Sequence, residues 1–209
     1  GSADTWRPIL PRRLPERRQA AAGLAFLERQ AAQHQPGDGL IRLAMDENAA
    51  PRNAVERAAF RSVRALRCEC VGWLRNDISS IPDGMSDLIG LGPGLTPSGD
   101  DLICGFLIGC HHVGEGARAQ DLWCRIKAHA EVATSPISRA HLAAAAEGQG
   151  AAALHHLLDA VIANHAGDII ETLDAVVRIG HSSGWDATGG IYLLLSGWLR
   201  ADVDKRVAA

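Results

Sequence analysis

Aromatic residues are scarce in this sequence and make up only 4% of the chain. Folds rich in β-strands usually carry more aromatic and β-branched side chains, whereas alanine, which is abundant here, is the best helix former. Apolar residues make up 47% and charged residues 22%, which is normal for a globular protein and excludes disorder of the whole chain. The composition therefore favours a helical, globular protein.

Basic stripes and long apolar runs are also absent. The formal net charge is −3, and the arginine-rich segment 7–18 is short and mixed with proline, as in a solvated arm. Nucleic acid is therefore not expected as a partner. The apolar stretch Leu102–Cys110 is broken by Gly105 and Gly109 and falls well short of the ~20 residues that span a bilayer. No secretory signal is found, so we expect a cytoplasmic protein that does not act at membranes.

The five cysteines form no disulfide framework, because their number is odd and their spacing is irregular. Cys68 and Cys70 make only a weak metal signal, since no second pair stands at the spacing of zinc ligands. We expect all five to be buried thiols, the usual state of free cysteine.

Helical patterns follow one another through short loops, which predicts an all-α bundle. A Gly/Pro-rich loop leads into its central helix. Residues 1–13 are expected to be an N-terminal arm, at the start of a piece of a longer protein, and residues 14–209 the helical domain. The segment Gly39–Met45 is ambiguous between a short strand and a loop. The predicted helices are Leu14–His34, Asn53 as a cap to about Leu74, Thr96 as a cap to about Val113, Ala117–Ala133, Ser138–Glu147, Ala151–Asn164, Asp168–Ile179 and Trp185–Leu199.

The sequence Gly-Leu-Gly-Pro-Gly-Leu-Thr-Pro-Ser-Gly-Asp-Asp, residues 90–101, carries the main functional signal. Thr96 is expected as the N-cap and Pro97 as the first helical residue. Free backbone N–H groups at a helix start attract anions such as phosphate or carboxylate. The turn is therefore a candidate anion site, although it also suits a capped helix after a tight turn. The candidate anion-binding residues are Gly92, Gly94, Thr96, Ser98 and Gly99.

Two adjacent carboxylates, Asp100 and Asp101, end this turn. Either could hold Mg²⁺ or act as a base, and both complement the dipole of the helix. They would repel a bare anion unless a cation intervened. We therefore treat both as candidate catalytic residues and as tentative ligands of Mg²⁺.

A second turn, Gly180-His181-Ser182-Ser183-Gly184-Trp185-Asp186, offers further candidates. His181 near Asp186 suits acid–base work, and Ser182 and Ser183 could bind a substrate. A histidine that merely caps a helix is the alternative. Ser138 and Arg139 add a hydroxyl and a guanidinium suited to a carboxylate or phosphate, although Arg139 equally suits the surface.

The two turns share the pattern Ser-Gly-x-Asp-x-x-x-Gly at an offset of 85 residues, from Ser98 and from Ser183. Four fixed positions in a chain rich in alanine and glycine can arise by chance. If the repeat is structural, its glycines, Gly105 and Gly190, would let two helices approach closely. Both helix starts would then face one site, with Asp101 equivalent to Asp186.

The stretch Leu88–Asp101 resembles the signature of a bacterial family long described as a domain of unknown function. That family includes the AllH component of the multi-subunit oxamate carbamoyltransferase of allantoin breakdown. Ile137-Ser138-Arg139 and the turn Gly180–Asp186 are also similar to the family, and the resemblance covers roughly Trp6 to Leu199. Members are usually longer at the N-terminus.

The resemblance implies carbamoyl transfer between carbamoyl phosphate and oxamate, giving oxalurate, in purine catabolism. We assign the phosphate to the Gly92–Gly99 amides, a cation or the attacking amide to Asp100 and Asp101, and proton transfer to His181. The alternative is a non-catalytic subunit that binds a small anion. Other subunits, or further copies of the chain, are expected as partners.

Overall fold

The computed structural model describes residues 6–11, 13–34, 36–76 and 84–207, with side chains described as far as residue 201. Every regular element in these ranges is a helix, which confirms the prediction of an all-α fold. The helices are α1 Arg17–His34, α2 Ile41–Met45, α3 Ala54–Arg75, α4 Gly84–Leu88, α5 Ser98–His112, α6 Gly116–Ala133, α7 Pro136–Ala146, α8 Ala152–Ala163, α9 Ala166–Val176 and α10 Ser183–Val207.

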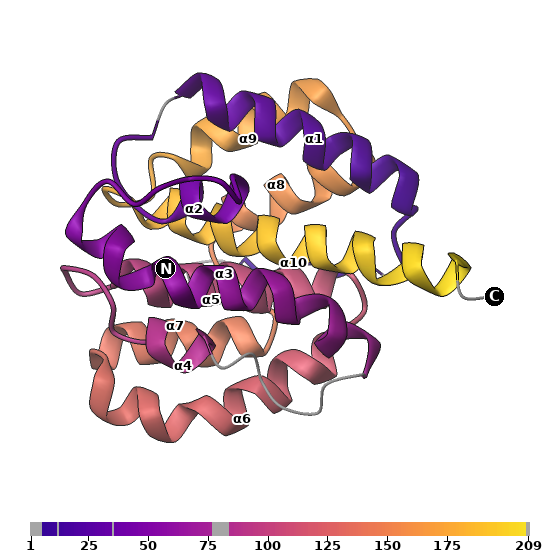
Figure 1. Ribbon diagram of the computed structural model, residues 1–209. Coiled ribbons are helices and arrows are strands. Elements are labelled where there is room, and N and C mark those ends of the chain that lie inside the picture. The colour runs from indigo at the N-terminus through magenta and orange to yellow at the C-terminus, as the bar shows by residue number, and fades with distance from the viewer. Residues whose placement is uncertain (1–5, 12, 35, 77–83, 208–209) are drawn as a thin grey trace, which may run out of the picture.

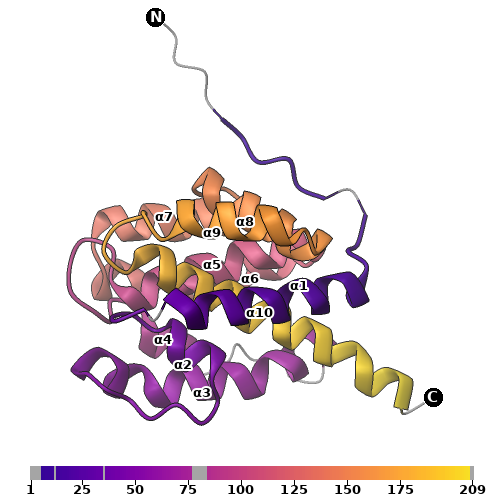
Figure 2. The ribbon, with the colours of Figure 1, turned by 90° about the horizontal axis from the view of Figure 1, so that it is seen from above.

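Two helices, α5 and α10, form the centre of the bundle. Figure 1 shows α10 crossing the middle of the molecule, with α1, α8 and α9 on one side and α4, α6 and α7 on the other. Every residue of α5 except His111 is buried. A helix that is buried on every side has to be surrounded by others, and α6, α7, α8 and α10 pack against it. In the view from above, the backbone of residues 6–11 leads away from the bundle (Figure 2), although the Trp6 ring lies 5.5 Å from that of His155 on α8.

Reciprocal glycines hold the central pair together. A Cβ atom on Gly105 would lie 1.9 Å from the carbonyl oxygen of Ala187, and one on Gly190 would lie 1.9 Å from that of Leu102. Gly190 and Ala187 are each 85 residues beyond Gly105 and Leu102. The same contact is therefore made twice with the two helices exchanged. The repeat seen in the sequence is structural, and its glycines let the backbones touch, as predicted.

The long helix α3 begins as the sequence indicates. The Asn53 side chain accepts a hydrogen bond from the backbone N–H of Glu56, and the helix ends at Asn76, whose φ is 64°. Asparagine tolerates this left-handed conformation better than most residues. The Asn53 cap placed the start of this helix, and the predicted end at about Leu74 is one residue short of the observed one.

The prediction for Gly39–Met45 was wrong, because Ile41–Met45 is the short helix α2. Ile41 and Ala44 pack on Gly189 of α10, each with an atom 3.2 Å from where a glycine Cβ would stand. This contact with a distant helix stabilises a turn too short to be helical on its own.

A helix was predicted to start near Thr96–Ser98, which is confirmed, but the predicted cap residue was wrong by one position. The helix begins at Ser98, and Pro97, with φ −57° and ψ 146°, is extended and outside it. Pro97, the residue that precedes the helix, provides no side-chain cap, and the hydroxyl of Thr96 lies 3.3 Å from the hydroxyl of Ser183. A contact between turns has replaced the local cap.

The cysteines are free, but not all are buried. Cys70, Cys104 and Cys110 are buried, whereas Cys68 and Cys124 are exposed on α3 and α6, contrary to expectation. Among the described helices, none has both the length and the apolarity to cross a membrane.

Candidate functional site

The two glycine-containing turns meet at the paired starts of α5 and α10. The hydroxyl oxygens of Thr96 and Ser183 are 3.3 Å apart. Each turn also folds over its own helix start, since a Cβ on Gly92 would lie 2.8 Å from the nitrogen of Ser98 and one on Gly180 would lie 3.0 Å from the hydroxyl of Ser183. The predicted convergence of the two turns is thereby confirmed.

Asp100 fastens the first turn to the start of α7. One carboxylate oxygen accepts a hydrogen bond from the Gly90 N–H at 2.8 Å. The other accepts from the hydroxyl of Ser138 at 2.7 Å and from that of Thr134. Ser138 and Asp100 are buried. Both were predicted site residues, but their polar groups are already hydrogen-bonded within the protein.

Asp101 has a different environment. Its residue is only 9% exposed, and its buried Oδ2 has no hydrogen-bond partner. Burial raises the pKa of Asp101 to about 6, and the charge of Asp100 raises it further. The hydroxyls of Ser183 and Thr96 and the charge of His141 oppose this increase. A carboxylate with this pKa can accept a proton near neutral pH.

Asp186 is the counterpart of Asp101 on α10. It is fully buried, and its Oδ1 accepts a hydrogen bond from the backbone N–H of Leu40 at 2.5 Å. Its Oδ2 is without a partner. Burial raises the pKa of Asp186 to about 6, against the opposing effects of the Leu40 N–H and of the Ser182 and Ser98 hydroxyls.

A cavity of about 270 Å³ opens beside Asp101, between α5, α7, α8 and the start of α10. Its described lining contains no lysine or arginine; it consists of Asp101, Cys104, Ile108, His141, Ala144, Ala145, Gln149, Gly150, Ala151, Leu154, Ile179, Ser183, Gly184 and Ala187. Burial raises the pKa of the Cys104 thiol well above its usual value, so this thiol is neutral and a poor nucleophile.

Sequence reasoning missed His141, which lines this cavity from α7. It stands one helical turn beyond Ser138, and residues three apart share a helix face. Because Ser138 belongs to the segment Ile137–Arg139 that resembles the family, its spacing from His141 was a signal that could have identified this histidine.

Several predicted residues lie elsewhere. His181 is 86% exposed at its side chain and contacts Asp38, with Nε2 3.0 Å from the carboxylate. Arg139 donates to the backbone carbonyl of Glu131 at 3.4 Å. Gly94 is exposed, with open space where a Cβ would stand. None of the three lines the cavity.

Gly99 serves packing as well as the turn. Its N–H donates to the carbonyl of Leu91 at 2.9 Å. A Cβ on Gly99 would lie 1.9 Å from the carbonyl oxygen of Leu88. One amide of the predicted anion cradle is thus already paired within the protein.

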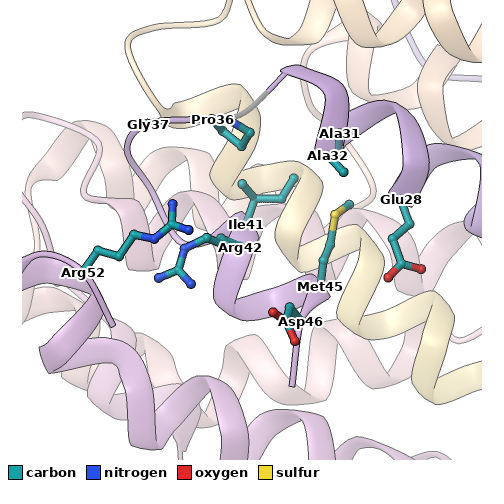
Figure 3. A pocket seen from close by; sticks show the side chains of 10 residues that line it. All are labelled: Glu28, Ala31, Ala32, Pro36, Gly37, Ile41, Arg42, Met45, Asp46 and Arg52. Atoms are coloured by element: carbon teal, nitrogen blue, oxygen red, sulfur yellow. The ribbon is translucent and has the colours of Figure 1, made fainter. Parts of the chain in front are cut away.

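A larger cavity, of about 420 Å³, lies between α1, α2 and the residues before α3. The guanidinium groups of Arg42 and Arg52 lie at one end of it and Glu28 at the other (Figure 3). Arg42 is held by the buried carboxylate of Glu56 at 2.5 Å. No residue of either glycine turn lines this cavity, so we take the smaller cavity beside Asp101 as the candidate site.

Among the described residues, no group of three or more His, Cys, Asp or Glu side chains is placed to hold a metal ion. A buried histidine pair lies near the cavity, where His112 Nε2 and His155 Nδ1 are 2.9 Å apart. Burial and the charge of His112 lower the pKa of His155 to about 4. This pair was not predicted, because its members lie on different helices.

No solved structure matches the chain. A family model described as oxamate carbamoyltransferase subunit AllH matches residues 88–195, just over half of the chain. This match begins at Leu88, the last residue of α4, and includes both turns and about half of α10. The chain belongs to the family of the oxamate carbamoyltransferase subunit AllH.

Proposed function

We propose that this chain supplies a substrate site to an oxamate carbamoyltransferase and that Asp101 is the proton acceptor there. One observation carries the proposal: a buried carboxylate with an unpartnered oxygen and a raised pKa lines a cavity of small-molecule size. Strongly perturbed carboxylates in clefts are candidates for acid–base work.

The reaction needs such a group. The amide nitrogen of oxamate forms a bond to the carbamoyl carbon of carbamoyl phosphate, and the bond from that carbon to the phosphate oxygen breaks. Phosphate leaves with the electron pair, and the proton of the amide nitrogen has to pass to a base. An amide nitrogen is a weak nucleophile, so removing its proton during the attack lowers the barrier.

Neighbouring side chains would assist Asp101 in this role. The hydroxyls of Thr96 and Ser183 lie beside its carboxylate and beside each other. Of the two, Ser183 lines the cavity and can contact the substrate. His141 lies at the exposed side of the cavity and can pass the proton to solvent. Asp100 is then a positioning residue, because its carboxylate already binds Gly90, Thr134 and Ser138.

The phosphate of the donor has to be held outside this cavity. The described lining has no lysine or arginine to balance its charge, and Asp101 would repel it. We assign it to the exposed side of the turn at residues 92–96, where Mg²⁺ or a cationic residue of a partner subunit would complete the site. Dependence on a second chain fits the description of this family as a subunit.

The same charge distribution favours a second candidate function, in which this chain only binds a small substrate and the chemistry takes place on a partner chain. The kcat and the substrate binding of an Asp101 variant distinguish the two functions. In the assembled enzyme, Asp101→Asn should lower kcat by about a hundredfold or more, the contribution of a general base. The matched control is Asp121→Asn, which changes an exposed carboxylate on α6 that pairs with Arg125. Loss of binding with unchanged kcat would instead support the non-catalytic role.

A further inference from the structure

The central helices α5 and α10 are related by the repeat, so the surroundings of the Asp101 and Asp186 carboxylates can be compared directly. The offset of 85 residues relates Asp101 to Asp186, Ser98 to Ser183 and Cys104 to Gly189. Each carboxylate is influenced by the serine of the other helix, Ser183 for Asp101 and Ser98 for Asp186. Each also keeps a buried Oδ2 without a hydrogen-bond partner.

The two halves differ in what covers them. On the α10 side, the N–H of Leu40 donates to Asp186, and Ile41 and Ala44 pack against Gly189. A Cβ on Gly39 would lie 2.6 Å from Oδ1 of Asp186, so the backbone itself lies against the carboxylate. On the α5 side, the equivalents Asp101 and Cys104 line the open cavity. The chain segment 39–44 thus fills a space whose counterpart beside Asp101 is a cavity.

We infer that the ligand of this cavity presents an amide N–H to Asp101, as the Leu40 peptide group does to Asp186. The ligand class is a small, planar primary or secondary amide. This inference rests on the proposed function and deepens it, because it assigns the cavity to the amide-bearing carbamoyl acceptor and not to the phosphorylated donor.

The residues that line the cavity beside Asp101 also favour an amide ligand, independently of the comparison with Asp186. A carboxylate or phosphate directed at Asp101 would meet like charge, whereas an N–H donor meets an acceptor. The apolar side chains of Ile108, Ala145 and Leu154 suit the flat face of an amide. His141, at the exposed side, can face an anionic end of the ligand.

The test compares two probes of nearly equal size. Oxamate carries an amide and a carboxylate, whereas oxalate replaces the amide with a second carboxylate. Calorimetric titrations at pH 7.5, on the full chain and on the assembled enzyme, should show oxamate binding about tenfold or more tightly than oxalate, because an unmatched polar group in a site is strongly rejected. Equal binding, tighter oxalate, or no binding of oxamate in either preparation would overturn the inference.

Asp101→Asn assigns the preference to this residue. Its side-chain amide can donate as well as accept, so the preference for oxamate should shrink to about threefold or less, while Asp121→Asn keeps it. Melting temperatures check that both variants are folded. The binding ratio in the wild type should also fall as the pH is lowered through about 6, the pKa of Asp101. A ratio that does not change with pH or in Asp101→Asn counts against the inference.

The outcomes separate this inference from the proposed function. If oxamate is preferred through Asp101 but the Asp101→Asn enzyme retains normal kcat, the amide assignment holds and the proton-acceptor role fails. If the variant enzyme is inactive but the wild type binds oxalate and oxamate equally tightly, the proton-acceptor role of Asp101 holds and the amide assignment fails.

Discussion

Asp100 and Asp101 are adjacent in the sequence, yet Asp100 has protein donors for both carboxylate oxygens while Oδ2 of Asp101 has none. The difference follows from helix geometry, because neighbouring residues on a helix point about 100° apart. Asp100 points toward the start of α7, and Asp101 toward the cavity and the start of α10. Equivalent substitutions at the two positions should therefore act in opposite ways.

Asp100→Asn should destabilise the fold. The carboxylate accepts from one N–H and two hydroxyls, whereas the amide would turn an N–H₂ group toward donors. Leaving buried donors to a charged group unpaired costs about 2–4 kcal/mol. Urea unfolding at pH 7.5 measures this loss, and a change below about 0.5 kcal/mol would show that Asp100 does not hold the turn to α7.

Asp101→Asn should stabilise the fold at neutral pH. The pKa of Asp101 in the folded protein is about 6, above the ordinary value of 3.8. The folded state therefore binds a proton more tightly than the unfolded state, and its stability falls as the pH rises from about 4 to about 6. At about 1.4 kcal/mol per pKa unit, the substitution should recover about 1–3 kcal/mol at pH 7.5.

This gain should disappear near pH 4, where the folded protein keeps Asp101 protonated. Unfolding curves for the wild type and the variant at pH 4 and 7.5 provide the comparison. Asp121→Asn, at an exposed position, serves as the control and should show little change at either pH. A variant less stable than the wild type at pH 7.5 would mean that the ionised carboxylate has a stabilising partner.

The glycines between the central helices should tolerate no side chain. In Gly105→Ala or Gly190→Ala the new Cβ would lie 1.9 Å from a backbone oxygen of the other helix. Relief requires the two central helices to move apart, so each variant should lose about 3 kcal/mol or more of unfolding free energy.

Gly167→Ala is the matched control, because Gly167 also lies in a helix but has nothing within 4 Å of its Cβ position. It should gain about 0.4–1 kcal/mol, since alanine restricts the unfolded chain and favours helix. Equal losses in Gly105→Ala and Gly190→Ala would support the equivalence of the two contacts. Wild-type stability in either variant would contradict the close approach.

The sequence was sufficient for features with a local or repeated signal. Asn53 and the apolar spacing after it placed α3. The repeated Ser-Gly-x-Asp-x-x-x-Gly brought Asp101 and Asp186 into one region, because both lie at the same point of equivalent helices. Backbone conformation and side-chain periodicity explain both successes.

Long-range contacts had no such signal. Leu40 reaches Asp186 across 146 residues, and only its backbone takes part, so its residue type gave no indication. The same packing made Ile41–Met45 helical. His141 was missed although its spacing of three residues from Ser138 places it on the same face of α7. His181 drew attention through its neighbours in sequence, yet its side chain lies on Asp38.

Substitutions of His141 and His181 should affect activity differently. His141 lines the cavity and its charge lowers the pKa of Asp101. His141→Gln removes that charge, so the pKa of Asp101 should rise. The acidic limb of the activity profile should then move to higher pH, and kcat/KM should fall by about tenfold or more, as for loss of an acid–base group. His181→Gln breaks an exposed pair with Asp38, of the kind worth about 0.2–1 kcal/mol, and should leave kcat/KM within about twofold. Profiles of the assembled enzyme between pH 5 and 9, with melting temperatures for both variants, measure these effects. If His181→Gln abolishes turnover and His141→Gln does not, proton transfer takes place at the surface beside Asp38 and not in the cavity.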